Sequence, residues 1–283
     1  MNYEEVLNKY TFINEIKCPH GEEVEVTEEA IQIYHEYDIY KKDWKVHEYN
    51  KPRNQMSTGG AWLYKENENT INIAGDILTA KSAFPYEYLK DKDVETLELY
   101  NLFERIYHSL GNCIPWCEGA NLGGGNYKYN DKYYGSCDFF TRKLNACKGV
   151  FDGNNKKKYR DTNIVACRIN QKKYLGRGVC NYTCLQFWIE REWINKNRNW
   201  GNFVKEHYLI DMVDENFDPI PFFVINDGRG NNLGEESDVI KMTLIQSIKL
   251  IIRRGYRIHN GIKEPFNDGE DKKVQEIFSN LGL

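Results

Sequence analysis

Residues 94–117 read VETLELYNLFERIYHSLGNCIPWC, and the rest of the chain is best interpreted outward from this stretch. Its first part carries apolar residues at the three- and four-residue spacing of one helix face. These residues are Leu99, Leu102, Phe103, Ile106 and Leu110. The spacing predicts a helix over 94–110. Gly111 or Asn112 then suits a left-handed cap, and Pro115 marks a turn.

The polar side of this helix carries a candidate chemical group. His108 follows Glu104 by four residues, and residues at that spacing are neighbours on a helix. An imidazole beside a carboxylate, and just before Asn112, is a candidate for acid–base chemistry. The simpler alternative is a histidine that bonds backbone near the helix end, where its positive form is favoured. The spacing leaves both interpretations open.

Other polar residues form a possible cleft with His108. Asp138 and Arg142 lie on one short helix that the sequence predicts, and Arg254 and Arg257 lie on the last turns of a long one. If the fold brings them together, they offer a carboxylate and phosphate anchors. The alternative for the two C-terminal arginines is a solvated helix face with interdomain salt bridges.

Charge is unevenly distributed, although the net charge is only −4. Residues 1–100 carry 20 Asp and Glu against 11 Lys and Arg, whereas residues 138–178 carry 11 Lys and Arg against three Asp. A basic segment of this kind indicates a surface for a polyanion such as nucleic acid. A solvated basic loop, or a patch paired with the acidic N-terminal part, explains the same pattern.

The chain has eight cysteines, and their spacing raises the question of zinc. Cys113 with Cys117, and Cys180 with Cys184, have spacings found in zinc sites, so four thiolates are a zinc alternative. We nevertheless predict no metal and buried free thiols, because Pro115 interrupts the first pair. We also expect a cytoplasmic protein without a membrane partner. The N-terminus lacks an apolar signal core, and no run approaches the roughly 20 apolar residues of a span.

The remaining patterns predict a single α+β domain over 1–283, mostly helical, with a small antiparallel sheet or hairpins. Apolar residues at 41% supply core material, and charged residues at 28% argue against disorder. Alternation over 61–64 and 70–74 predicts a hairpin, and helical spacing predicts a long helix over 235–258. Residues 1–60 are a candidate peripheral N-terminal extension.

The order of several motifs carries a resemblance to other proteins. The motifs are His108-Ser109-Leu110-Gly111-Asn112, Ile114-Pro115-Trp116, a loop with Asn121, Asp138-Phe139-Phe140-Thr141-Arg142-Lys143-Leu144, Leu209-Ile210-Asp211-Met212-Val213 and Arg254-Gly255-Tyr256-Arg257-Ile258. In this order they resemble a set of uncharacterised bacterial proteins, mainly of Firmicutes, that share a domain of unknown function. Gly123-Gly124-Gly125 departs from their pattern. The resemblance implies one α+β unit, brings no established activity, and adds Asn121 to the ligand-binding candidates.

Two hypotheses from different classes follow. The first is a protein that binds or acts on a phosphate-bearing ligand, a nucleotide or nucleic acid, with His108, Glu104 and Asp138 as its catalytic candidates. Its ligand-binding candidates are Asn112, Asn121, Arg142, Arg254 and Arg257. The alternative is a non-enzymatic protein-interaction module, such as an antitoxin or phage-defence accessory. In that case exposed aromatics and opposite charge blocks would dock a partner.

Overall fold

The structure is a computed structural model that describes residues 3–13, 45–47, 62–64, 72–78, 93–117, 128–129, 132–133, 139–153, 189–190, 193–220 and 236–283. Its helices are α1 (Tyr3–Lys9), α4 (Val94–Ile106), α5 (Phe139–Phe151), α8 (Trp200–Glu206), α9 (Glu236–Asn260) and α10 (Asp268–Leu281). Short 3-10 turns are η1 (Thr11–Ile13), η6 (Ile194–Lys196) and η7 (Ile210–Met212). Its strands are β1 (Lys45–His47), β2 (Trp62–Tyr64), β3 (Asn72–Ile77), β4 (Cys113–Cys117), β5 (Lys128–Tyr129) and β6 (Lys132–Tyr133).

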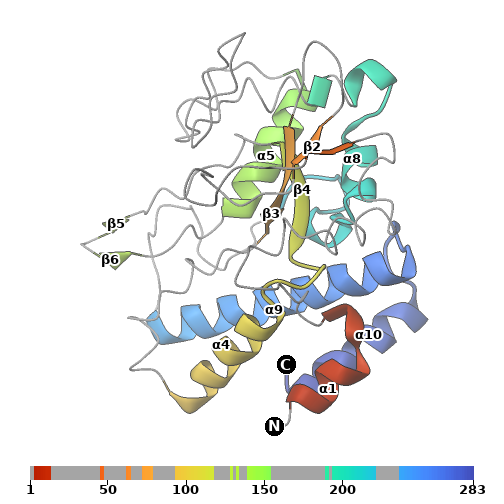
Figure 1. Cartoon of the computed structure of the whole chain (residues 1–283). Helices are drawn as coiled ribbons and strands as arrows, with labels where there is room; N and C mark the ends of the chain where they lie inside the picture. Colours follow the sequence, from red (N-terminus) through yellow and green to blue (C-terminus); the bar gives the residue numbers. More distant parts are fainter. Residues whose placement is uncertain are drawn as a thin grey trace.

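The strands pair only with antiparallel neighbours. β1 to β4 pair in sequence order, and β5 pairs separately with β6. The pairing of β2 with β3, in which Leu63 lies opposite Ile73, joins the two segments whose alternation predicted a hairpin. In Figure 1, β2, β3 and β4 lie between α5 and α8, while α1, α4, α9 and α10 gather at the other end of the molecule.

The expected α+β class is wrong, because the described part of the chain is mainly helical. The strands are two to six residues long, and the buried cluster is built almost entirely from helices and the turns that join them. Among the strand residues whose side chains the structure describes, Ile114 of β4 belongs to that cluster. Alternation over a few residues identifies local pairing, but the elements that bury the most apolar surface determine the class.

α4 forms where the apolar spacing predicted a helix. Asp93 caps its start, since one carboxylate oxygen accepts from the Thr96 backbone N–H at 2.9 Å and the other from the Thr96 hydroxyl at 2.9 Å. The predicted apolar stripe is confirmed, and its residues Leu99, Leu102, Phe103, Ile106 and Leu110 are all buried. The helix ends at Ile106, four residues before the predicted end, and a turn over 107–112 follows.

α9 is the helix against which α4 packs. Its predicted apolar side is confirmed at Leu244, Ile248, Ile251 and Ile252, which are all buried. None of the helices in the described ranges has the length and apolar content needed to cross a membrane.

The N-terminal residues belong to the same core as α4 and α9. Leu7 and Ile13 are buried within it. Most of 1–60 lies outside the described residues, so the N-terminal extension expected there stays a prediction.

Candidate functional site

The turn over 107–112, here called the junction, is tied to α9 by Arg254. This guanidinium is buried, and its Nη1 donates to the carbonyl oxygens of Leu110 at 3.2 Å and Gly111 at 2.9 Å. Its Nε donates to the carbonyl oxygen of His207 at 3.1 Å. Arg254 thus joins three segments that are far apart in the sequence, and these bonds give it a structural role.

Gly111 lies so close to α9 that a side chain at this position would overlap the helix backbone. A Cβ at this position would lie 2.0 Å from the carbonyl oxygen of Ile251 and 2.9 Å from the backbone nitrogen of Gly255. On the facing helix, a Cβ at Gly255 would lie 3.7 Å from the Gly111 Cα. The glycine ending the α4 segment is therefore required for the close approach of two backbones.

Asn112 stabilises the turn that follows α4. Its side chain is buried, and its Nδ2 donates to the Tyr107 carbonyl oxygen at 2.7 Å. Its own carbonyl oxygen accepts from the Leu78 N–H at 2.8 Å, which connects the junction to the end of β3. Because these bonds hold the turn together, Asn112 is not directed toward solvent as a ligand-binding group.

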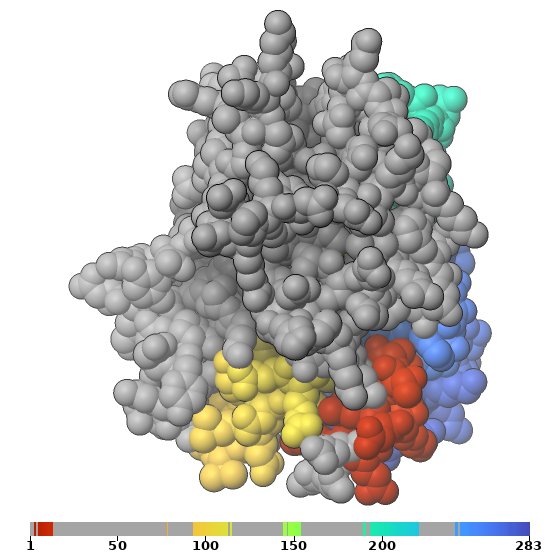
Figure 2. All heavy atoms as spheres, viewed as in Figure 1, coloured from red at the N-terminus to blue at the C-terminus, as the bar shows by residue number. Residues whose placement is uncertain are grey.

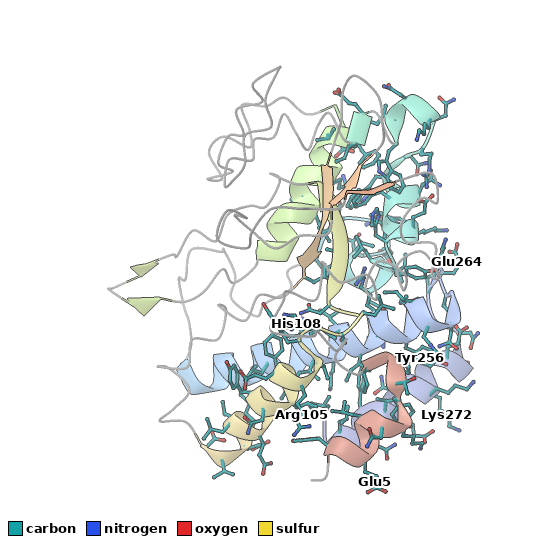
Figure 3. The ribbon with its side chains drawn as sticks, viewed as in Figure 1. Glu5, Arg105, His108, Tyr256, Glu264 and Lys272 are labelled. Atoms are coloured by element: carbon teal, nitrogen blue, oxygen red, sulfur yellow. The ribbon has the colours of Figure 1, made fainter. Side chains whose placement is uncertain are left out.

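His108 and Glu104 are the predicted residues of this site that keep partial contact with solvent, since both are half-buried. The His108 ring lies 4.5 Å from the Tyr107 ring, between ring centroids. Burial raises the pKa of Tyr100 to about 12, and the charge of Glu104 and a hydrogen bond to it add to this effect. Glu104 thus interacts with Tyr100, one turn earlier, as well as lying one turn before His108. Figure 3 shows His108 where α4 ends above α9.

Arg257 lies one turn beyond Arg254 and points to another partner. It is fully buried, and its Nε and Nη2 donate to the two carboxylate oxygens of Asp211 at 2.5 and 3.0 Å. Its Nη1 donates to the Glu264 carbonyl oxygen at 2.6 Å.

Arg253 adds a bond from its Nε to Asp211 at 3.0 Å and one from its Nη1 to Asp271 at 2.9 Å. We call Asp211, Arg253, Arg257 and Asp271 the ion-pair cluster.

The ion-pair cluster is closed by an aromatic ring. The guanidinium carbons of Arg257 and Arg253 lie 3.7 and 4.8 Å from the centroid of the Phe266 ring, within the range of cation–π attraction. Burial acts to raise the pKa of Asp211, but the hydrogen bond from Arg257 and the charges of Arg257 and Arg253 together lower it. The carboxylate therefore stays ionised and holds η7 against α9.

The predicted cleft does not take shape around the two arginines. Arg254 reaches the junction but bonds its carbonyl groups, and Arg257 bonds Asp211, so both guanidinium groups face protein. In Figure 3, Glu264, whose carbonyl Arg257 contacts, lies beyond the end of α9 and away from His108. These bonds give Arg254 and Arg257 a packing role, and the ligand-binding role predicted for them stays a prediction.

The remaining candidates lie wholly or partly outside the described residues. Asp138 and Asn121 fall outside them, and Arg142 lies on α5 with only its backbone described. Most of the basic 138–178 segment is also outside. Sequence reasoning missed Asp211 and Asp271 as partners of the arginines. The signal for Asp211 was its place in the apolar 209–213 segment, because a carboxylate buried there needs a cation.

The backbone of β4 argues against the zinc alternative. Cys113 and Cys117 begin and end this extended strand, so about 13 Å separates their Cα atoms. Two thiolates on one zinc ion lie within about 5 Å of each other. Cys180 and Cys184 fall outside the described residues. Among the described cysteines, Cys147 is buried, as predicted for the group.

Ser109 is a buried residue of the junction whose hydroxyl finds no hydrogen-bond partner in the part of the chain that the structure describes. An unsatisfied buried hydroxyl is destabilising, so we expect Ser109→Ala to raise the free energy of unfolding by about 1 kcal/mol. Urea denaturation followed by circular dichroism measures the change. Ser247→Ala is the matched control, because Ser247 is equally buried but engaged by a neighbouring group, and we expect it to gain nothing. A clear loss of stability in Ser109→Ala would instead indicate an internal water at the hydroxyl.

No known protein family, curated protein or solved structure that was compared with this chain matches it. The resemblance based on the motif order therefore stays a prediction, and the function has to be argued from the described residues themselves.

Proposed function

We propose that this protein is a non-enzymatic protein-interaction module. The observation that carries the proposal is an exposed apolar end shared by α4 and α9. Val94 is 74% exposed and Met242 is 48% exposed, which is unusual for large apolar side chains. Next to these two side chains, Lys241 of α9 forms an ion pair with Glu95 of α4, which joins the two helices. Both helices begin side by side at the left of Figure 1.

The chemistry of this end suits a protein partner. Val94 and Met242 provide apolar contact area, and Met is adaptable in shape. The neighbouring Asp93, Glu95 and Lys241 supply a charged rim, and an apolar centre with a polar rim is the usual composition of an interface. Arg254 and Arg257 donate their hydrogen bonds to groups inside the protein. This supports the same proposal, because the competing enzyme hypothesis relies on these two arginines as phosphate anchors.

Binding that depends on this surface tests the proposal. Tagged wild-type protein and a Val94→Asp/Met242→Glu variant are used to capture partners from the native cells. A protein recovered with the wild type is then purified and titrated against both chains by calorimetry. We expect the variant to bind at least tenfold more weakly, because it places charge at the interface centre. Ile194→Asp, which alters another exposed apolar residue, should bind like the wild type. Equal affinity of wild type and variant would contradict the proposal.

A second candidate function is the binding of a phosphate-bearing ligand, a nucleotide or nucleic acid. The observation that favours it is the partial exposure of His108 and Glu104 at the junction. Fluorescence anisotropy with a labelled oligonucleotide across a salt series tests this function. Contacts to phosphate predict a steep loss of affinity as salt rises, and His108→Gln should weaken binding at each salt concentration. No binding at about 20 mM salt would reject it.

A further inference from the structure

The exposed end of α4 and α9, which Val94 and Met242 define, continues into the protein along two apolar rows. Leu97 follows Val94 by three residues on α4, and Ile245 follows Met242 by three residues on α9. Residues at this spacing are neighbours on a helix surface. Leu97 and Ile245 are half-buried and pack against the core, which holds each row in place on a rigid helix. Figure 2 shows α4, in yellow and orange, open to solvent at the lower edge of the view.

The rim of the exposed end is acidic. Asp93, Glu95 and Glu98 are all exposed, and Glu98 follows Val94 by four residues, so it lies one turn further along the same helix side. The ion pair described at this end joins Lys241 to Glu95. Three carboxylates therefore share one ammonium group, and the rim has an excess of negative charge.

The helix dipole explains only part of this charge. The hydrogen bond from the Thr96 backbone N–H, and then the one from its hydroxyl, lower the pKa of Asp93, so this carboxylate is ionised at neutral pH. Carboxylates in the first turn of a helix are stabilised by its dipole, which accounts for Asp93 and Glu95. Glu98 lies in the second turn of α4, where the dipole has little effect. Its charge is thus available to a partner.

The other described cations of the two helices lie away from the exposed end. The Lys249 Nζ lies 5.3 Å from the centroid of the Phe278 ring, and Arg253 belongs to the ion-pair cluster. Arg105 is in the last turn of α4, about three turns from Val94. The negative charge of the rim therefore faces solvent without compensation from these groups.

The arrangement of this end favours a helix as the bound element. The exposed groups are side chains, since the backbone groups of regular helices bond within the helix, and no strand edge is offered here. An amphipathic helix can lay its apolar side on such a surface. The acidic rim repels a polyanion, so nucleic acid and an anionic membrane are both disfavoured at this end.

We propose that the partner of the exposed end presents an amphipathic helix with lysines or arginines along the edges of its apolar side. The apolar side covers Val94 and Met242, and the flanking cations lie opposite Asp93 and Glu98. The apolar contacts supply most of the affinity, while the charges speed the encounter and fix the orientation. This inference rests on the proposed function, because it names the class of partner for the same surface.

Selection from a library of random peptides tests the inference. The full-length chain is immobilised, and peptides of about 16 residues, or four helical turns, are selected for binding to it but not to Val94→Ser/Met242→Ser. This variant removes apolar area and keeps the charge of the rim, and circular dichroism checks that it folds. We expect the selected peptides to carry apolar residues at three- and four-residue spacing, with a clear excess of Lys and Arg over Asp and Glu.

Charge reversal in the rim distinguishes a local contact from general attraction to an acidic protein. A labelled selected peptide is titrated by fluorescence anisotropy against Glu98→Lys. Glu215→Lys is the matched control, because Glu215 is also exposed and lies on the turn after η7. At about 50 mM salt, Glu98→Lys should bind roughly fivefold more weakly than the wild type, and Glu215→Lys within about twofold of it. At about 500 mM salt the difference should shrink.

The outcomes separate the inference from the proposed function. Selected peptides that depend on Val94 and Met242 but have no excess of cations, or that bind Glu98→Lys as tightly as the wild type, would overturn the inference and leave the proposed function standing. A selection that yields no peptide able to distinguish the wild type from Val94→Ser/Met242→Ser would contradict both.

Discussion

Replacing Gly111 by alanine is expected to lower the free energy of unfolding by about 3 kcal/mol, a large fraction of the stability of a domain. The new Cβ would lie 2.0 Å from the Ile251 carbonyl oxygen and 2.9 Å from the Gly255 nitrogen. Both are backbone atoms of a helix, so no side-chain rotation relieves the overlap, and α4 and α9 have to separate. Urea denaturation monitored by circular dichroism and by tryptophan fluorescence measures the loss.

Gly269→Ala is the control for the general effect of a glycine substitution. A Cβ at Gly269, in the first turn of α10, meets only the Asn267 side-chain oxygen at 3.3 Å. Alanine is the better helix former, so we expect a change below about 1 kcal/mol in either direction. If Gly111→Ala were no more destabilising than Gly269→Ala, the junction and α9 would not be in close backbone contact.

The sequence predicted the helices near Gly111 well, but the turn predicted at Pro115 is wrong, because Pro115 lies within β4. Apolar spacing located α4 and α9 and assigned their buried sides, because periodicity records which side of a helix loses contact with water. The left-handed cap predicted at Gly111 or Asn112 is wrong, because α4 ends at Ile106, its cap residue Tyr107 is right-handed, and neither Gly111 nor Asn112 has a positive φ. Gly111 instead permits a helix–helix contact whose other half, Gly255, lies more than 140 residues away.

Long-range pairing limited the prediction of the site. Lys249, Arg253 and Arg257 lie four residues apart, and that spacing predicts one basic helix side. It does not show that Asp211, 46 residues before Arg257, is buried opposite. A phosphate anchor and an arginine in an internal ion pair therefore have the same local sequence. The fold class was misjudged for a similar reason. Alternating apolar residues in short segments predict strands, but they do not show how small a part of the core those strands form.

Replacing Asp211 by asparagine is expected to lower the free energy of unfolding by about 3–5 kcal/mol near neutral pH. The change leaves Arg257, which is 1% exposed, without the carboxylate that both its Nε and its Nη2 contact. Asparagine keeps the size and one oxygen of the side chain, so the loss reports charge and not a cavity. Urea denaturation of the wild type and Asp211→Asn between pH 3 and pH 7 measures it.

The pH dependence identifies the carboxylate as the source of this stability. The arginines hold the pKa of Asp211 below its usual range, so the unfolded chain binds a proton more readily than the folded one. The contribution of Asp211 is then fully present above about pH 4 and is lost as the pH falls through the pKa of the folded state. The difference between wild type and Asp211→Asn should therefore shrink toward pH 3.

Asp271→Asn provides the matched control, because Asp271 also contacts Arg253 but its side chain is 44% exposed, against 13% for Asp211. Solvent screening limits such a pair to less than about 1 kcal/mol. Equal losses in the two variants would mean that burial does not determine the strength of the ion-pair cluster. A large loss in Asp211→Asn alone would instead establish that the arginine pairs hold η7 on α9, and that Arg257 is committed to the fold and not to a phosphate ligand.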